Sequence, residues 1–474
     1  MKLVKVKNLK KYKTNENAMK NLNKKESFAQ SVMALMTAQV IVKILGLFYK
    51  LYITNRKGFG DEGNAIANSA FQIYSLILSL TSLGIPSALS KIIAEKLSIG
   101  DHRNANKIFR ITLFIFSIIG LIGSYALFAF SKQIAENYLK IKEARLSIIA
   151  LAPSIFLVAI ISVFKGYFIG REEIKKTAKA QGVDQLVKTF FTFIVIELNV
   201  FFTKENNTMV MASISNLATT FGNIAELIYL VVSYKKEYNE ISLEIQNSVN
   251  YSYLSLRKII KEVLSVAIPI SLTGLIITIS KNIDSISIVH ILSKVIGYEK
   301  AKKQYGILSG KVDALINLPL SFNMAIITAL LPSIASSKNN VLVMKKRIKK
   351  SFIFGFLLTL PVTIIYFIFP NKILKILFFN AYDGYDLLRI SSISIIFIMV
   401  EQISNTILQA IGKTKIPIIS ILIGVIIKAL LNFILVNKTG FILGGARGAA
   451  FSSVCCHFIA GFISFYFVYK NIYK

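Results

Sequence analysis

Residues 28–54 read FAQSVMALMTAQVIVKILGLFYKLYIT, an apolar run with a lysine near its middle. If the run is a helix, Gln39, Lys43, Gly46 and Lys50 fall at spacings of four, three and four, and therefore share one face. A charged side chain at the centre of a bilayer costs about 2.5–3.5 kcal/mol even on the lenient insertion scale. Lys43 therefore predicts a wet cavity or a charged partner, and we expect this face to meet an anionic substrate.

The composition indicates a membrane protein. The 474 residues are 54% hydrophobic and only 17% charged, with a mean hydropathy of +0.60. Apolar runs of about 20 residues, each long enough to cross the hydrocarbon core, recur along the whole chain. We expect an all-α polytopic protein of the cytoplasmic membrane with twelve transmembrane helices. These lie near residues 28–54, 66–89, 109–131, 147–170, 182–202, 209–234, 263–293, 312–336, 350–370, 387–411, 416–436 and 446–469.

The net charge of +32 does not indicate nucleic-acid binding, because most of it is lysine in short connections between apolar runs. Lys and Arg are roughly twice as frequent in the connections on one side as on the other, which places both termini in the cytoplasm. Lys300, Lys302 and Lys303 form the one connection that disagrees, because they fall on the outer side.

An internal repeat predicts two related lobes. The segments around Lys188, Gly170 and Pro86 recur about 240 residues later, around Lys428, Gly412 and Pro332. A repeat of six spans enters the membrane from the same side twice, which gives a parallel repeat around a central cavity. We therefore expect a basic cytoplasmic tail (1–27), an N-terminal six-helix lobe (28–234), a cytoplasmic linker (235–262) and a C-terminal six-helix lobe (263–470).

Several polar residues within the spans are candidates for the cavity. We expect substrate contacts from Lys43 and Lys50, with further polar groups at Gln39, Gln72, Ser75, Asn223, Asp313 and Asn317. Lys50 lies near the outer end of its helix, so snorkelling is an equal alternative for it. Ser82, Asn216 and Gln409 are further cavity candidates, although interhelical hydrogen bonding is an equal alternative for all such groups.

The remaining charged residues in the spans suggest ion pairs or snorkelling. Glu401 and Lys428 lie at similar depth on neighbouring spans, so we predict that they pair, and Asp284 lies nearer the outer face. A coupling or gating site is the alternative role for these three residues. Lys165 and Lys188 lie near the inner surface and are expected to snorkel, and Glu226 has no obvious partner.

The sequence gives little support for catalysis or metal binding. The three histidines are far apart in sequence, and Cys455 and Cys456 are adjacent within an apolar run. The chain has no phosphate-binding glycine loop or nucleophile–base pair. Asp383 and Asp386 stand in a short outer connection, which is typical of a turn. We therefore expect no enzyme activity, no metal and no cofactor.

Short motifs along most of the chain resemble the stage V sporulation protein B family and the related MurJ-type flippases for lipid-linked peptidoglycan precursors. The resemblance begins at Lys43-Ile-Leu-Gly46, where the family also has a basic residue before the glycine. The other matching motifs are Gly60-Asp-Glu-Gly63, Gln72-Ile-Tyr-Ser-Leu, Leu83-Gly-Ile-Pro86, Ala88-Leu-Ser-Lys91, Phe164-Lys-Gly-Tyr-Phe-Ile-Gly170, Asp184-Gln-Leu-Val-Lys188, Asn282-Ile-Asp284-Ser, Asn317-Leu-Pro319, Leu330-Leu-Pro-Ser333 and Ile407-Leu-Gln-Ala-Ile-Gly-Lys413.

The resemblance implies the fold of the multidrug/oligosaccharidyl-lipid/polysaccharide exporter superfamily, in which two bundles alternate access around a cationic cavity. It implies a polyprenyl-pyrophosphate substrate that carries sugars. A diphosphate group fits a lysine-lined cavity. We expect a monomer that binds this lipid and membrane lipids, with a role in peptidoglycan, cell-wall or other envelope polysaccharide synthesis, including sporulation.

Two departures from the family pattern matter. Peptidoglycan-precursor flippases usually add two helices after the twelfth, which leaves handling of the lipid tail open here. Relatives place an acidic or amide residue where Lys428 stands. A lysine there would replace the charge of a cation and neutralise Glu401 or Asp284, so we do not predict a sodium site. Two alternatives remain: a cation-coupled multidrug exporter of the same superfamily, and a non-transporting partner in spore-envelope assembly.

Overall fold

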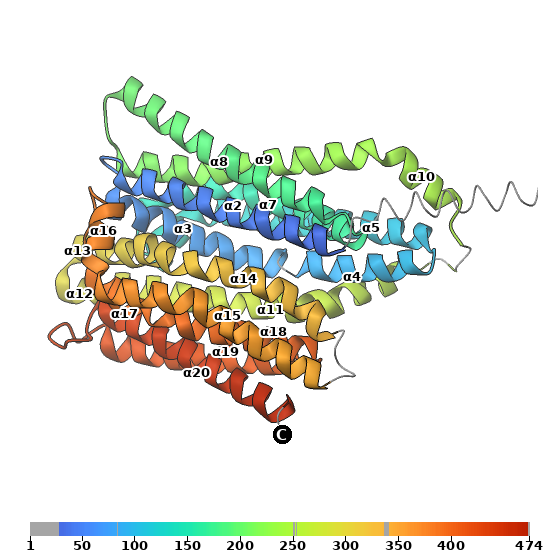
Figure 1. Ribbon diagram of the computed structural model, residues 1–474. Helices are drawn as coiled ribbons and strands as arrows, with labels where there is room; N and C mark the ends of the chain where they lie inside the picture. Colours follow the sequence, from blue (N-terminus) through green and yellow to red (C-terminus); the bar gives the residue numbers. More distant parts are fainter. Residues whose placement is uncertain (1–27, 83, 250–251, 253, 336–340, 473–474) are drawn as a thin grey trace, which may run out of the picture.

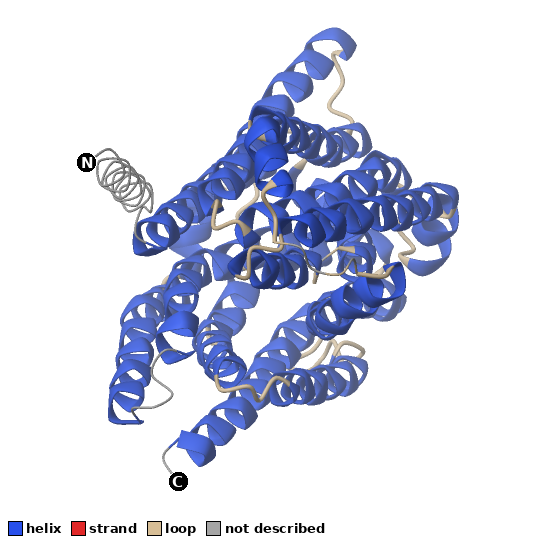
Figure 2. Ribbon diagram, turned by 90° about the vertical axis from the view of Figure 1, so that its right-hand side faces the viewer, coloured by secondary structure: helices blue, strands red, loops and turns tan. Residues whose placement is uncertain are grey.

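The chain folds into a bundle of long helices. A computed structural model describes residues 28–82, 84–249, 252, 254–335 and 341–472, and these residues include no β-strand (Figures 1 and 2). The expected N-terminal tail, residues 1–27, lies outside the described residues. We refer below to residues 28–246 as the first half and to residues 256–472 as the second half.

The helices follow one another with short connections. The first half contains α2 (Phe28–Asn55), α3 (Gly60–Thr81), α4 (Ile85–Ser98), α5 (His102–Ala129), α6 (Ser131–Gln133), η1 (Ile134–Tyr138), α7 (Ala144–Gly170), α8 (Ile174–Thr203), α9 (Thr208–Lys236) and α10 (Tyr238–Gln246). The second half contains α11 (Leu256–Ile286), η2 (Ser287–Leu292), α12 (Ser293–Ile296), α13 (Tyr298–Gly306), η3 (Ile307–Val312), α14 (Asp313–Ala335), α15 (Val341–Ile368), α16 (Pro370–Leu377), α17 (Tyr385–Ser392), α18 (Ser394–Ala410), α19 (Lys415–Leu435) and α20 (Ala446–Ile472).

Each of the twelve expected spans overlaps at least one of these helices. In the described part of the chain, ten helical stretches are long and apolar enough to cross a membrane. The multi-pass prediction is therefore confirmed. The number twelve is not, because α2 and α14 are not among the ten.

Side-chain caps fix where several helices begin. Asp101 accepts a hydrogen bond from the backbone amide of Asn104 at the start of α5, and Ser255 accepts one from Lys258 at the start of α11. Asn207 accepts two such bonds before α9. These oxygens satisfy amides that have no partner within the helix, so the sequence itself sets these boundaries.

The second expected span, residues 66–89, is interrupted. α3 ends at Thr81, and α4 begins at Ile85 with Pro86 in its first turn, a position where proline is well tolerated because it needs no amide hydrogen bond there. Gly84 stands at the break against α11, where a Cβ atom would lie 2.2 Å from the carbonyl oxygen of Ala267. The break therefore lets the two halves approach closely.

Helix packing is dense within each half and continues between the halves. In the first half α7 packs against α3, α4, α5 and α9, and in the second half α20 packs against α17, α18 and α19. The halves meet where α2 contacts α14, and where α3 contacts α11, α13 and η3.

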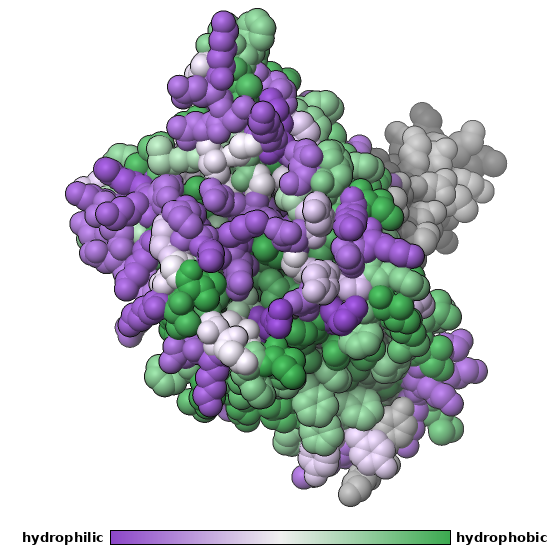
Figure 3. Space-filling view, turned by 90° about the vertical axis from the view of Figure 1, so that its left-hand side faces the viewer, coloured by the Kyte–Doolittle hydropathy of each residue, from purple (hydrophilic) through white to green (hydrophobic). Residues whose placement is uncertain are grey.

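The two ends of the bundle differ from its sides. We call the end with α12, α13 and α16 the α13 end, and the opposite one the α10 end (Figure 1). Figure 3 looks onto the α13 end, where hydrophilic side chains gather over much of the face. Along the bundle large apolar side chains are exposed instead, such as Phe114 (69%), Leu121 (57%) and Tyr125 (71%) of α5. Such a surface suits contact with lipid.

Candidate functional site

A cavity of about 320 Å³, which we call the lysine cavity, lies between the two halves. Its first-half wall comes from α2, α3, α8 and α9, and its second-half wall from α11, η3 and α14. Four lysines and one aspartate line it, so its formal charge is +3. These charged residues are Lys43, Lys50, Lys188, Lys281 and Asp313.

The α2 lysines reach the cavity because of their helical spacing. Lys43, Gly46 and Lys50 all line it, as expected for residues that share one helix face. Lys50 donates a hydrogen bond of 2.6 Å to the side-chain oxygen of Asn64 on α3. Lys43 is exposed to the cavity, and it forms no ion pair within the described part of the chain.

The other two lysines come from α8 and α11. The Lys188 ammonium lies 5.4 Å from the ring centre of Tyr49 and 5.7 Å from that of Phe71, so aromatic faces stabilise its charge. Lys281 is exposed, and neither lysine has a carboxylate within ion-pair distance among the described residues. The cavity therefore presents positive charge that the protein itself does not neutralise.

The expected substrate residues divide into three groups. Lys43, Lys50, Gln72, Asp313 and Asn317 line the lysine cavity. Ser75 and Asn223 do not line it; Ser75 is partly buried on α3, and Asn223 is buried on α9. Gln39 belongs to α2, but its side chain lies outside the described residues. A role in substrate binding stays a prediction for all of them.

Two cavity lysines were missed or misread from the sequence. Lys188 was expected to snorkel to the surface, and Lys281 was not recognised as a candidate. A usable signal existed for Lys281, because it stands within an apolar span directly before Asn282-Ile-Asp284. Whether Lys281, Asn282 or Asp284 would face a cavity depended on how α11 is rotated relative to α14, which is a matter of tertiary packing.

The expected ion pair between Glu401 and Lys428 is wrong, and Lys428 instead pairs with the alternative partner, Asp284. Lys428 lies 2.6 Å from Asp284 on α11, and it also donates to the carbonyl and hydroxyl oxygens of Ser280. Glu401 lies 2.8 Å from Nδ1 of His457 on α20. The reason is helix packing. α19 packs against α11, so Lys428 lies beside Asp284, whereas α18 packs against α20, so Glu401 lies beside His457.

The first-half charges also have partners. Lys165 lies 2.8 Å from Glu226, so it pairs across α7 and α9 instead of snorkelling, and Glu226 does not lack a partner. Both side chains are largely buried, at 19% and 5% exposure. A buried lysine and a buried carboxylate each compensate the desolvation cost of the other.

A second cavity of about 400 Å³, which we call the second-half cavity, adjoins the first. It is lined by α11, η3, α14, α17, α18, α19 and α20, and it contains the pairs Lys428–Asp284 and Glu401–His457. Among the sequence candidates, Asp313 and Asn317 line both cavities, whereas Asp284, Glu401, Gln409 and Lys428 line only this one.

At the α13 end ion pairs join the two halves. Lys311 of η3 is fully buried and lies 2.8 Å from Asp61 of α3, and it also donates to the carbonyl oxygens of Ala381 and Asp383. Lys302 lies 3.1 Å from Glu143 and 2.9 Å from Glu299, and Lys303 lies 2.7 Å from Asp383. Lys302 and Lys303, two of the three lysines in the connection that disagrees with the Lys and Arg distribution, are thus paired with carboxylates.

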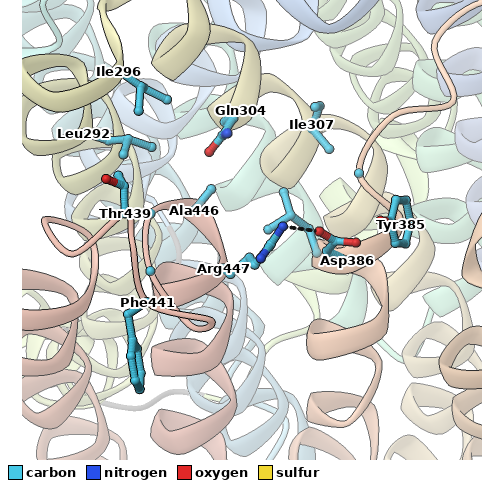
Figure 4. A pocket seen from close by; sticks show the side chains of 14 residues that line it. Leu292, Ile296, Gln304, Ile307, Tyr385, Asp386, Thr439, Phe441, Ala446 and Arg447 are labelled. Carbon is cyan, nitrogen blue, oxygen red and sulfur yellow. Dashed lines mark ion pairs between the residues drawn. The ribbon is translucent and has the colours of Figure 1, made fainter.

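A pocket of about 350 Å³ also opens at the α13 end (Figure 4). Arg447 and Asp386 form an ion pair of 2.6 Å in it, so Asp386 is held by a cation from α20. Asp383 and Asp386 therefore have separate lysine and arginine partners. In the part of the chain that the structure describes, no group of His, Cys, Asp and Glu could hold a metal ion.

Comparisons with known proteins agree with this architecture. A solved structure described as an inward-facing multidrug resistance MATE family transporter of the MOP superfamily is similar with a TM-score of 0.74 and 16% identity, covering 93% of this chain and 98% of that chain. The chain has this fold. The Stage V sporulation protein B of Bacillus subtilis (strain 168) is 24% identical over 433 residues, or 91% of this chain and 81% of that protein.

The Lipid II flippase MurJ of the same organism is 25% identical over 444 residues, or 88% of this chain and 80% of that protein. Residues 309–471 also match the family described as Lipid II flippase MurJ. More than half of the chain, residues 28–338, matches the family described as Polysaccharide biosynthesis protein. The chain therefore belongs to the polysaccharide biosynthesis protein family.

Proposed function

We propose that this protein moves a polyprenyl-pyrophosphate-linked oligosaccharide, a peptidoglycan precursor or a related envelope polysaccharide, across the cytoplasmic membrane by alternating access. The observation that carries the proposal is the lysine cavity, where four lysines and one aspartate face a common space between the two halves. A diphosphate group carries the opposite charge, and lysine is a common phosphate ligand. The names of two relatives, a Lipid II flippase and a sporulation protein, support this substrate class.

In this mechanism Lys43 and Lys50 bind the pyrophosphate, and Lys188 and Lys281 add to the positive field. The N-terminal lobe (28–234) and the C-terminal lobe (263–470) then rock about the site, so that the cavity opens to one side at a time. Both termini lie in the cytoplasm, and the protein acts as a monomer without enzyme activity. The distribution of Lys and Arg among the connections supports this orientation.

The charge of the cavity argues against the multidrug alternative. Most drugs that such exporters carry are cationic, and a formal charge of +3 would repel them. The non-transporting alternative would be favoured by cavity lysines that are neutralised internally. Among the described residues Lys43 and Lys281 have no such carboxylate.

A reconstituted translocation assay tests the proposal. Purified protein in liposomes is given a fluorescent polyprenyl pyrophosphate that carries one N-acetylhexosamine, and its movement between leaflets is followed. We expect Lys43→Ala to abolish translocation and Lys43→Arg to retain part of it, because the positive charge is kept. Lys57→Ala removes an exposed lysine outside the cavity and serves as the matched control. Equal rates in Lys43→Ala and in the parent protein would remove this lysine from the mechanism.

A further inference from the structure

The lysine cavity and the second-half cavity share part of their walls. Lys281 on α11 and Asp313 and Asn317 on α14 line both of them. A ligand in one cavity therefore reaches the other by passing these three side chains. Lys281 is exposed and has no ion-pair partner among the described residues, so its ammonium group is available at the junction.

The two cavities differ in their charge. The lysine cavity has an excess of positive charge, whereas in the second-half cavity Asp284 is paired with Lys428 and Glu401 with His457. Apart from the shared residues, Lys428 offsets the charge of Asp284, and Glu401 has only His457 as its partner, so this cavity has no excess of positive charge. A diphosphate fits the first cavity by charge, and an uncharged polar group fits the second.

Neutral hydrogen-bonding groups dominate the polar lining of the second-half cavity. They include the amides Gln402, Asn405 and Gln409 and the hydroxyls Thr273, Ser280 and Ser453. Gln409 is exposed, and within the described part of the chain its side chain forms no hydrogen bond. Between these groups stand aliphatic side chains such as Ile277, Ile398 and Val425. A lining that combines amide, hydroxyl and aliphatic groups suits a sugar, which has hydroxyls on its edges and C–H groups on its faces.

We propose that the second-half cavity binds the sugar portion of the transported lipid while its pyrophosphate occupies the lysine cavity. This inference rests on the proposed function and adds a specificity site to it. Lys281 binds the phosphate next to the sugar, because it stands where the two cavities join. The volume of about 400 Å³ is near the lower end of ligand pockets, which fits one or two sugar units next to the pyrophosphate.

The test compares two lipids and the same substitution in both cavities. Full-length protein in nanodiscs is titrated with a polyprenyl pyrophosphate, and with the same lipid carrying one N-acetylhexosamine. We expect the sugar to increase affinity about tenfold in the parent protein, as one or two new hydrogen bonds allow. Gln409→Ala should remove this gain and leave the affinity for the bare lipid as it was. Gln72→Ala, an amide in the lysine cavity, should weaken both lipids equally.

The outcomes separate this inference from the function on which it rests. If the parent protein binds both lipids with the same affinity, or if Gln409→Ala keeps the gain from the sugar, the sugar site is wrong and the pyrophosphate site stands. If the parent protein binds neither lipid, the proposed function fails and this inference fails with it. Circular dichroism and thermal unfolding of Gln409→Ala establish that the variant is folded.

Discussion

The ion pair between Asp61 and Lys311 is expected to hold the α13 end of the protein closed. It joins α3 of the first half to η3 of the second, and the two side chains are 3% and 0% exposed. Alternating access requires that this end open, so the pair must separate in the other state. We predict that Lys311→Met shifts the protein toward the arrangement that is open at the α13 end.

The size of the shift follows from burial. Removing one partner of a buried pair costs about 3–5 kcal/mol, because the remaining charge stays buried without compensation. In Lys311→Met the carboxylate of Asp61 has this cost in the closed arrangement only, since water reaches it when the end opens. The equilibrium should therefore move by a factor on the order of 10² to 10⁴.

Pulsed electron paramagnetic resonance in nanodiscs measures the change. Spin labels at Glu205 in the α8–α9 connection and at Lys438 after α19 occupy exposed positions of the two halves at the α13 end. In the parent protein we expect a short distance to dominate, and in Lys311→Met a longer one. Adding Asp61→Asn to Lys311→Met leaves no buried charge and should restore much of the short distance.

Lys303→Met is the matched control for this measurement. Lys303 also pairs with a carboxylate at the α13 end, but Lys303 and Asp383 are 48% and 54% exposed and both belong to the second half. An exposed pair contributes about 0–1 kcal/mol, so this variant should keep the parent distances. If Lys311→Met gives the same distances as Lys303→Met, the Asp61–Lys311 pair does not hold this end closed.

Three further predictions concern stability. Lys428→Met should lower the thermal unfolding temperature strongly and Lys428→Met with Asp284→Asn much less, because only the single variant leaves a buried carboxylate without its cation. Gly84→Ala should also lower the thermal unfolding temperature, because the new Cβ atom would lie 2.2 Å from the carbonyl oxygen of Ala267 on α11. An unchanged unfolding temperature would mean that α11 moves away from Gly84 without loss of stability. Burial raises the pKa of the Glu143 carboxyl, but hydrogen bonds from its own backbone amide and from Lys302 outweigh this and bring the pKa below its usual value. Its contribution to stability is therefore present above about pH 4.5 and is lost as the pH falls through the lowered pKa. Glu143→Gln should be less stable than the parent protein at pH 7, and the difference in unfolding temperature should shrink as the pH is lowered below about 4.5.

The helices and their order could be predicted from the sequence. Apolar length and the capping residues Asp101, Asn207 and Ser255 act within one segment, so they fix helices wherever these lie in the bundle. The interruption of the second span at Gly84 was not predicted, because Pro86 fits a kinked helix as well as a new one. The close approach of α11 to Gly84 is a tertiary contact that no local pattern contains.

For the site, the sequence by itself determined that Lys43 and Lys50 share one face of a helix, because helical periodicity is a property of the segment alone. Only the tertiary structure decided which other charges join them. Lys188 and Lys281 reach the same cavity, whereas Lys428 meets Asp284 and Glu401 meets His457, since partners are chosen by the rotation and neighbours of packed helices. A charge within an apolar span must be paired with an opposite charge or face water, and this requirement can be read from the sequence. The packing of α11, α18, α19 and α20 determines which partner each charge has.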